Sequence, residues 1–156
     1  MDLAHTRLGA RGDRWSTSRG ILDVRTPASD VVTRRFEGYA TIDLIEPAIR
    51  HLEALIASGV QPLLFNDFEL GTGYDSDVRT RLTAWHQRHA GDVKEIHILV
   101  RPGLVAMGVT VANLAMGGRF TTYTDRSAFE WALAGVMTSR ITAGPPASLR
   151  APPSVR

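Results

Sequence analysis

Acidic and hydroxyl side chains gather in a glycine-containing segment near the middle of the chain. Residues 65–78 read FNDFELGTGYDSDV and contain Asp67, Asp75, Ser76 and Asp77. The pattern indicates a strand, a glycine turn and the start of a helix. Carboxylate and hydroxyl oxygens at such a position can accept hydrogen bonds from the unpaired N–H groups of the first helical turn. The segment can therefore cap a helix, present a polar turn to another molecule, or do both.

Both interpretations of this turn remain open. In the first, Asp75 or Ser76 caps the helix and Asp77 complements its dipole, which stabilises the fold by about 1 kcal/mol. In the second, Ser76 is a modifiable hydroxyl or the whole turn is a docking surface. A phosphate on Ser76 would add close to two negative charges beside existing acids. Such a change would repel an acidic partner or attract an arginine.

Neither the acids nor the histidines form a recognisable metal or catalytic motif. The acids Asp67, Glu69, Asp75 and Asp77 do not have the spacing of a calcium loop. The chain has no cysteine, and it contains no P-loop, G-x-G-x-x-G segment or nucleophile elbow. We therefore expect a protein that is not an enzyme and that holds no metal ion and no cofactor.

Histidines give the enzymatic alternative its only other support. His86 and His89 are three residues apart on one predicted helix, and His97 lies on the following predicted strand. This spacing can place two imidazoles on one side of a helix, but no third ligand and no acid to orient them accompanies the pair. An enzyme would need these histidines or the acids to converge in one pocket.

Composition predicts one soluble globular domain. The 156 residues are 44% hydrophobic and 22% charged, with a formal net charge of +2. The cations are scattered along the chain rather than clustered with aromatic residues, which argues against nucleic-acid binding. The N-terminus lacks the apolar region of a secretion signal, and no apolar run reaches the roughly 20 residues of a membrane span. We expect a cytoplasmic protein.

Hydrophobic periodicity predicts an alternation of strands and helices. We expect a β-hairpin from two strands, a helix ended by Gly59, and then alternating strands and helices. The predicted strands are 21–25, 31–37, 62–66, 95–100 and 120–124, and the predicted helices are 41–58, 75–91, 104–116 and 127–137. The fold class is α/β, with a mixed, mostly parallel five-stranded sheet and about four helices. Residues 1–13 are predicted to be flexible, 14–138 to form the domain, and 139–156 to be a disordered proline-rich tail.

The predicted helix 104–116 carries no charged residue. A helix that is apolar all round is usually buried, but an exposed part would mark a partner surface or the wall of a ligand pocket. The candidate apolar surface comprises Leu104, Val105, Met107, Val109 and Met116. This helix motivates an alternative function, a carrier of an apolar small molecule or lipid lodged between the helix and the sheet.

The order of the elements resembles that of the STAS domain, the fold of SpoIIAA-type anti-sigma-factor antagonists. Four short segments are similar to the family's motifs over roughly residues 14–138. They are FEGYAT at 36–41, GYDSDV at 73–78, NLAMG at 113–117, and FNDF at 65–68 taken together with WAL at 131–133. This chain is thus identified as a divergent, SpoIIAA-like member of the STAS superfamily.

The resemblance implies a phosphorylation switch at the turn. In the family, a kinase anti-sigma factor phosphorylates a serine at the helix start, and this dissociates the complex. Asp75 and Ser76 match the family's aspartate and first serine, whereas its usual phosphoacceptor serine falls on Asp77 and the following glycine on Val78. Three hypotheses follow: Asp77 supplies a fixed negative charge, Ser76 is the acceptor instead, or the switch has been lost.

Together these arguments predict a non-enzymatic bacterial regulatory protein that acts by protein–protein contact. Its partner would be an anti-sigma factor or a kinase. The expected contact surface comprises Tyr74, Asp75, Ser76, Asp77, Arg79 and Arg81, and the helix 104–116 is the second candidate surface. The oligomeric state is left open.

Overall fold

One mixed sheet organises the chain. The computed structural model describes residues 2–103 and 120–143, and within them seven strands pair in sequential order. Strands β1 to β4 are antiparallel, whereas β4 to β7 are parallel. The strands are β1 (Ala4–Arg7), β2 (Gly12–Ser16), β3 (Gly20–Ala28), β4 (Val31–Ala40), β5 (Leu63–Tyr74), β6 (Glu95–Leu99) and β7 (Phe120–Tyr123).

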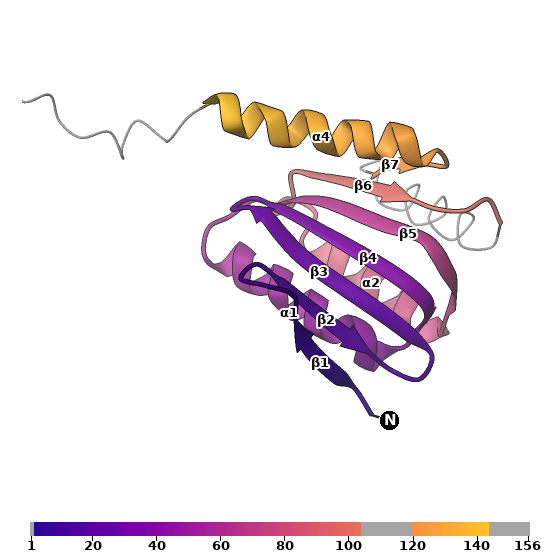
Figure 1. The fold of residues 1–156 in the computed structure, drawn as a ribbon. Coiled ribbons are helices and arrows are strands. Elements are labelled where there is room, and N and C mark those ends of the chain that lie inside the picture. Colours follow the sequence, from indigo (N-terminus) through magenta and orange to yellow (C-terminus); the bar gives the residue numbers. More distant parts are fainter. Residues whose placement is uncertain (1, 104–119, 144–156) are drawn as a thin grey trace, which may run out of the picture.

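Helices cover both faces of the sheet (Figure 1). The helices α1 (Ile42–Ala57) and α2 (Ser76–Arg88) pack on one face, and α4 (Arg126–Ala143) packs on the other. The larger apolar core lies under α1 and α2, and a smaller one lies between α4 and the strands β4, β5 and β6. Within the described residues, no helix has both the length and the hydropathy required to cross a membrane.

The predicted hairpin and the first two helices are confirmed. In α1 the apolar stripe is buried against the sheet, as the helical spacing of its residues requires. Gly59 follows this helix with φ 90°, a conformation that L side chains rarely adopt. Periodicity located these elements correctly because each has one buried face and one exposed face.

The predicted sheet was wrong in strand number and in direction. Seven strands form it within the described residues, not five, and antiparallel and parallel pairings are equally numerous rather than mostly parallel. Residues 1–13, expected to be flexible, contain β1 and the start of β2. All four residues of β1 are exposed, so no apolar alternation marks it; His5 and Arg7 instead pair with Asp13 on β2.

Two boundaries also differ from the prediction. Helix α4 ends at Ala143, so the tail expected from residue 139 begins inside a helix. Strand β5 continues to Tyr74, where a turn around Gly71 and Gly73 was expected. A Cβ at either glycine would lie 3.1 Å from an aromatic ring, Phe36 or Tyr39, so these glycines permit close packing and do not mark a turn. The predicted helix 104–116 and residues 144–156 lie outside the described residues, in which three helices are present.

Gly38 is expected to be intolerant of a side chain. Its φ is +88°, and a Cβ there would lie 2.5 Å from the carbonyl oxygen of Arg19. Gly38→Ala should lower the free energy of unfolding by about 2 kcal/mol or more, measured by urea titration. Gly135→Ala is the matched control, because nothing lies within 4 Å of its Cβ position in α4; it should stabilise the helix by about 0.5–1 kcal/mol. Equal effects of the two substitutions would contradict the steric role assigned to Gly38.

Candidate functional site

The turn before α2 is held by a cation and an aromatic ring. Asp75 occupies the N-cap position, but its side chain forms no capping hydrogen bond. Its carboxylate lies 3.9 Å from the guanidinium of Arg19, and that guanidinium stacks over the ring of Tyr39 at 3.8 Å. Hydrogen bonding to Asp75 raises the pKa of the Tyr39 hydroxyl. The side-chain cap predicted from Asp75 or Ser76 is therefore not formed by Asp75, whose contacts instead fasten the turn to Arg19, in the loop before β3, and to Tyr39 on β4.

The next residues of the predicted surface face solvent. Ser76, Asp77 and Arg79 are exposed, and the Asp77 carboxylate accepts a hydrogen bond from the N–H of Val78 at 2.9 Å. The Ser76 hydroxyl forms no hydrogen bond with the described residues. Its oxygen is therefore accessible for modification or for contact with a partner.

Arg81 and Tyr74 contact other parts of the fold and are not fully exposed to a partner. The Arg81 guanidinium donates to Glu46 at 2.7 Å and lies 3.9 Å from Glu53, so it connects α2 to α1. Hydrogen bonding to Glu46 raises the pKa of Arg81. Tyr74 is half-buried and lines a cavity beneath the helices. The structure therefore separates the six predicted residues into an exposed group (Ser76, Asp77, Arg79) and a supporting group (Tyr74, Asp75, Arg81).

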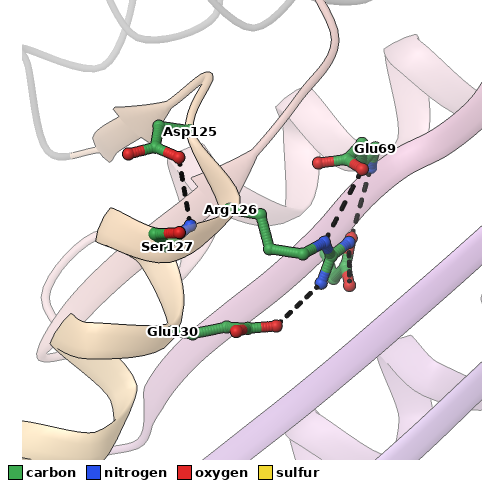
Figure 2. Close-up of polar contacts among 6 residues, drawn as sticks. Glu69, Asp125, Arg126, Ser127 and Glu130 are labelled. Atoms are coloured by element: carbon green, nitrogen blue, oxygen red, sulfur yellow. Dashed lines mark hydrogen bonds and ion pairs between the residues drawn. The ribbon is translucent and has the colours of Figure 1, made fainter.

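Asp67 does not join the acids of the turn. It lies on the α4 side of the sheet, where both of its carboxylate oxygens accept hydrogen bonds from Arg126 at 2.9 and 3.0 Å. Figure 2 shows Arg126 extending from the start of α4 toward Glu69, with Glu130 one helical turn away. These contacts attach α4 to β5. No group of three or more metal-ligating side chains occurs within the described residues.

An apolar cavity of about 150 Å³ lies between the sheet and the helices α1 and α2. Its floor is formed by side chains of β3, β4, β5 and β6, and Val78, Leu82 and His86 contribute its α2 wall. Tyr74 and Arg79, which flank the turn in sequence, both line the cavity, so the cavity lies directly beneath the turn. The inner side of the turn therefore borders the cavity while its outer side faces solvent.

Two polar residues on the cavity floor were missed as site residues in the sequence. Arg34 on β4 is 6% exposed and Asn66 on β5 is 1% exposed; the Arg34 Nε–H donates to Asn66 Oδ1 at 2.7 Å. Burial lowers the pKa of Arg34 to about 10, so the guanidinium remains charged at neutral pH. In the sequence, Arg34 is one of many scattered cations. Arg34 lies two residues from both Val32 and Phe36, which are buried on one face of the sheet. Because side chains alternate along a strand, this spacing could have predicted that Arg34 points to the same buried face.

The histidines lie on opposite faces of the sheet. His86 is on α2 and His89 is its C-cap residue. Burial, together with the nearby charges of Arg34 and His89, lowers the pKa of His86 to about 3. His97 lies on the α4 side, stacked on Phe65 and hydrogen-bonded to Tyr123 and Glu95. These three histidines therefore do not meet in one pocket, as the enzymatic alternative would require of them. The candidate apolar residues Leu104, Val105, Met107, Val109 and Met116 lie outside the described residues.

Comparison with known proteins identifies the fold. No protein-family model and no curated protein sequence matches the chain. A protein of the DUF3478 family with a SpoIIAA-like fold, from Shewanella loihica PV-4, is similar with a TM-score of 0.54 and 20% identity, over 74% of this chain and 96% of that one. An anti-sigma factor antagonist from Mycobacterium paratuberculosis is similar with a TM-score of 0.49 and 16% identity, over 71% and 91%. The first match shows that this chain has a SpoIIAA-like fold, which is the fold that the sequence resemblance predicted.

The pKa of His86 predicts acid sensitivity. Because the folded-state pKa of about 3 lies below the ordinary 6.5, the unfolded state binds more protons at pH values between the two. The free energy of unfolding is therefore unaffected by His86 above pH 6.5 and decreases as the pH falls from 6.5 toward 3. His86→Gln should reduce the slope of the unfolding free energy against pH by on the order of 1 kcal/mol per unit in this range. Urea titrations from pH 7 to about pH 4 would measure it.

The matched control is Gln87→Ala, at an exposed position beside His86 in α2. It should keep the pH dependence of the wild type. An unchanged slope in His86→Gln would show that His86 titrates normally in the folded protein and that burial does not lower its pKa.

Proposed function

We propose that this chain is a non-enzymatic STAS-like regulatory protein that binds a protein partner through the exposed start of α2. The contact surface consists of Ser76, Asp77 and Arg79, supported from beneath by Tyr74, Asp75 and Arg81. The partner proposed from the sequence resemblance is an anti-sigma factor or a kinase. The observation that carries the proposal is the exposure of the Ser76 hydroxyl and of two oppositely charged side chains, Asp77 and Arg79, beside a turn whose backbone is hydrogen-bonded to β4.

The supporting contacts favour recognition without rearrangement. The Asp75 N–H donates to the Ala40 carbonyl at 3.1 Å, and the Asp75 side chain is near Arg19 and Tyr39. Arg81 holds the next turn of α2 against α1. A partner that binds Ser76, Asp77 and Arg79 would therefore order few additional groups, which lowers the entropic cost of association.

The charge of Asp77 supports the fixed-charge form of the switch. Its carboxylate already interacts with the backbone N–H of Val78, in the first turn where a negative charge complements the helix dipole. Ser76, however, has the accessible oxygen that a kinase would need. Phosphopeptide mapping from the native host separates the two hypotheses, because phosphate on Ser76 would rule out Asp77 as the substitute for a phosphorylated residue.

A second candidate function is a carrier or binder of an apolar small molecule or lipid. The cavity between the sheet and the helices α1 and α2 favours it, since most of its walls are apolar side chains. The sequence placed this function between the sheet and the helix 104–116. The cavity in the structure is bounded by α1 and α2, so the proposal now rests on these two helices.

Substitutions in the turn test the protein-contact proposal. Ser76→Ala and Asp77→Ser remove exposed groups and should leave the fold intact. Each should lower the recovery of a specific partner, in affinity purification from the native host read by quantitative mass spectrometry. A loss of about tenfold in affinity corresponds to one charge-assisted hydrogen bond.

Asp43→Ser is the matched control, because Asp43 is an exposed acid in the first turn of α1. It should recover the same partner as the wild type. If all four proteins recover the same set in the same amounts, the start of α2 is not the contact surface. Urea titration of each variant would verify that the fold is retained.

A further inference from the structure

The charge of Arg34, on the cavity floor, has no counter-ion among the described residues. Arg34 forms one side-chain hydrogen bond, to the neutral Asn66, and no ion pair with any described residue. The sequence has 16 Asp and Glu residues, and all of them lie within the described ranges 2–103 and 120–143. No acidic side chain of the described ranges therefore neutralises Arg34.

An isolated charge in this position is costly. Removing an ion from water costs several kcal/mol even after the surroundings relax, and only a well-placed partner compensates for it. Burial lowers the pKa of Arg34, but the group stays protonated at neutral pH. A guanidinium has five N–H donors, and Asn66 accepts from only one of them. The other donors are available to a molecule in the cavity that Arg34 lines.

The remaining walls define the rest of such a molecule. Leu22, Phe36, Ile45, Ile49 and Ile98 present hydrocarbon surface to the cavity. The volume is about 150 Å³, and an apolar protein cavity of about this size accommodates one benzene molecule. An apolar body of about six carbon atoms therefore fits.

We propose that this cavity binds a small monocarboxylate whose carboxylate accepts hydrogen bonds from the Arg34 guanidinium and whose apolar body packs between the sheet and the helices α1 and α2. The inference rests on the second proposed function, binding of an apolar molecule, and specifies the chemical class of that molecule. A single negative charge matches the single buried guanidinium. A dianion such as a phosphate monoester would leave one charge without a partner in apolar surroundings.

Paired ligands test the carboxylate separately from the cavity. Hexanoate and hexan-1-ol have the same hydrocarbon chain and differ at the head group. Titration of the full chain, followed by the methyl resonances of isoleucine in two-dimensional NMR, should show both ligands shifting Ile45, Ile49 and Ile98. Hexanoate should bind about tenfold or more tightly than hexan-1-ol, as expected for hydrogen bonds between charged groups.

Two arginine variants locate the anchoring charge. Arg34→Met should lose the preference for hexanoate while it keeps hexan-1-ol binding. It should remain folded because the removal of a buried charge offsets the loss of the hydrogen bond to Asn66. Arg34→Lys keeps the charge but loses the planar donors, so it should show an intermediate preference. Arg35→Met is the matched control: Arg35 is the next residue on β4 but is exposed, and its removal should leave both affinities unchanged.

The other outcomes distinguish failure of the carboxylate inference from failure of apolar binding altogether. Equal affinity of the two ligands would overturn the carboxylate inference while apolar binding stands. Failure of both ligands to shift the cavity methyls, up to their solubility limits, would overturn both. Hexanoate selectivity that survives in Arg34→Met but disappears in Arg79→Met would place the carboxylate at the exposed Arg79, on the edge of the cavity, and would overturn the role of Arg34.

Discussion

The hydrogen bond between the Arg34 guanidinium and Asn66 is the central polar contact on the face of the sheet that α1 and α2 cover. Arg34 and Asn66 stand opposite each other in the parallel register of β4 and β5, and their hydrogen bond links the two strands through side chains as well as backbone. The buried charge requires water or an anion beside it, because apolar surroundings alone would leave it uncompensated. The cavity under α1 and α2 provides that space. Burial and the charge of Arg34 together keep His86 neutral on the α2 wall.

The cavity and the exposed turn are two sides of one structural element. Tyr74 and Val78 contribute to the cavity wall, whereas Ser76 and Asp77, between them in sequence, face solvent. Arg19, Tyr39 and Ala40 attach this turn to the antiparallel half of the sheet. A bound small molecule would therefore contact the inner side of the segment whose outer side we propose to meet a protein. The two proposed functions are compatible in one molecule.

Sequence patterns predicted the elements that have one apolar face. They failed for elements whose structure depends on polar contacts or on close packing at glycine. The stripe of α1 and the β3–β4 hairpin were recognisable, whereas β1 is fully exposed and is paired through backbone hydrogen bonds and the contacts of Asp13. Gly71 and Gly73 suggested a turn, yet they serve the close approach of Phe36 and Tyr39 within a strand. At the start of α2, the exposure of Ser76, Asp77 and Arg79 agrees with the predicted surface, and their contact with a partner stays a prediction. Arg34 was missed because pairing and burial between distant strands are not visible in the order of the cations along the chain.

The role of Arg34 is tested most directly by a crystal structure of the full chain with hexanoate. We predict electron density for the ligand between the sheet and the helices α1 and α2, with its carboxylate within hydrogen-bonding distance of the Arg34 guanidinium. Hexanoate bound elsewhere, or bound in the cavity with its carboxylate directed away from Arg34, would contradict the claim that this buried charge is the anchor of a ligand site.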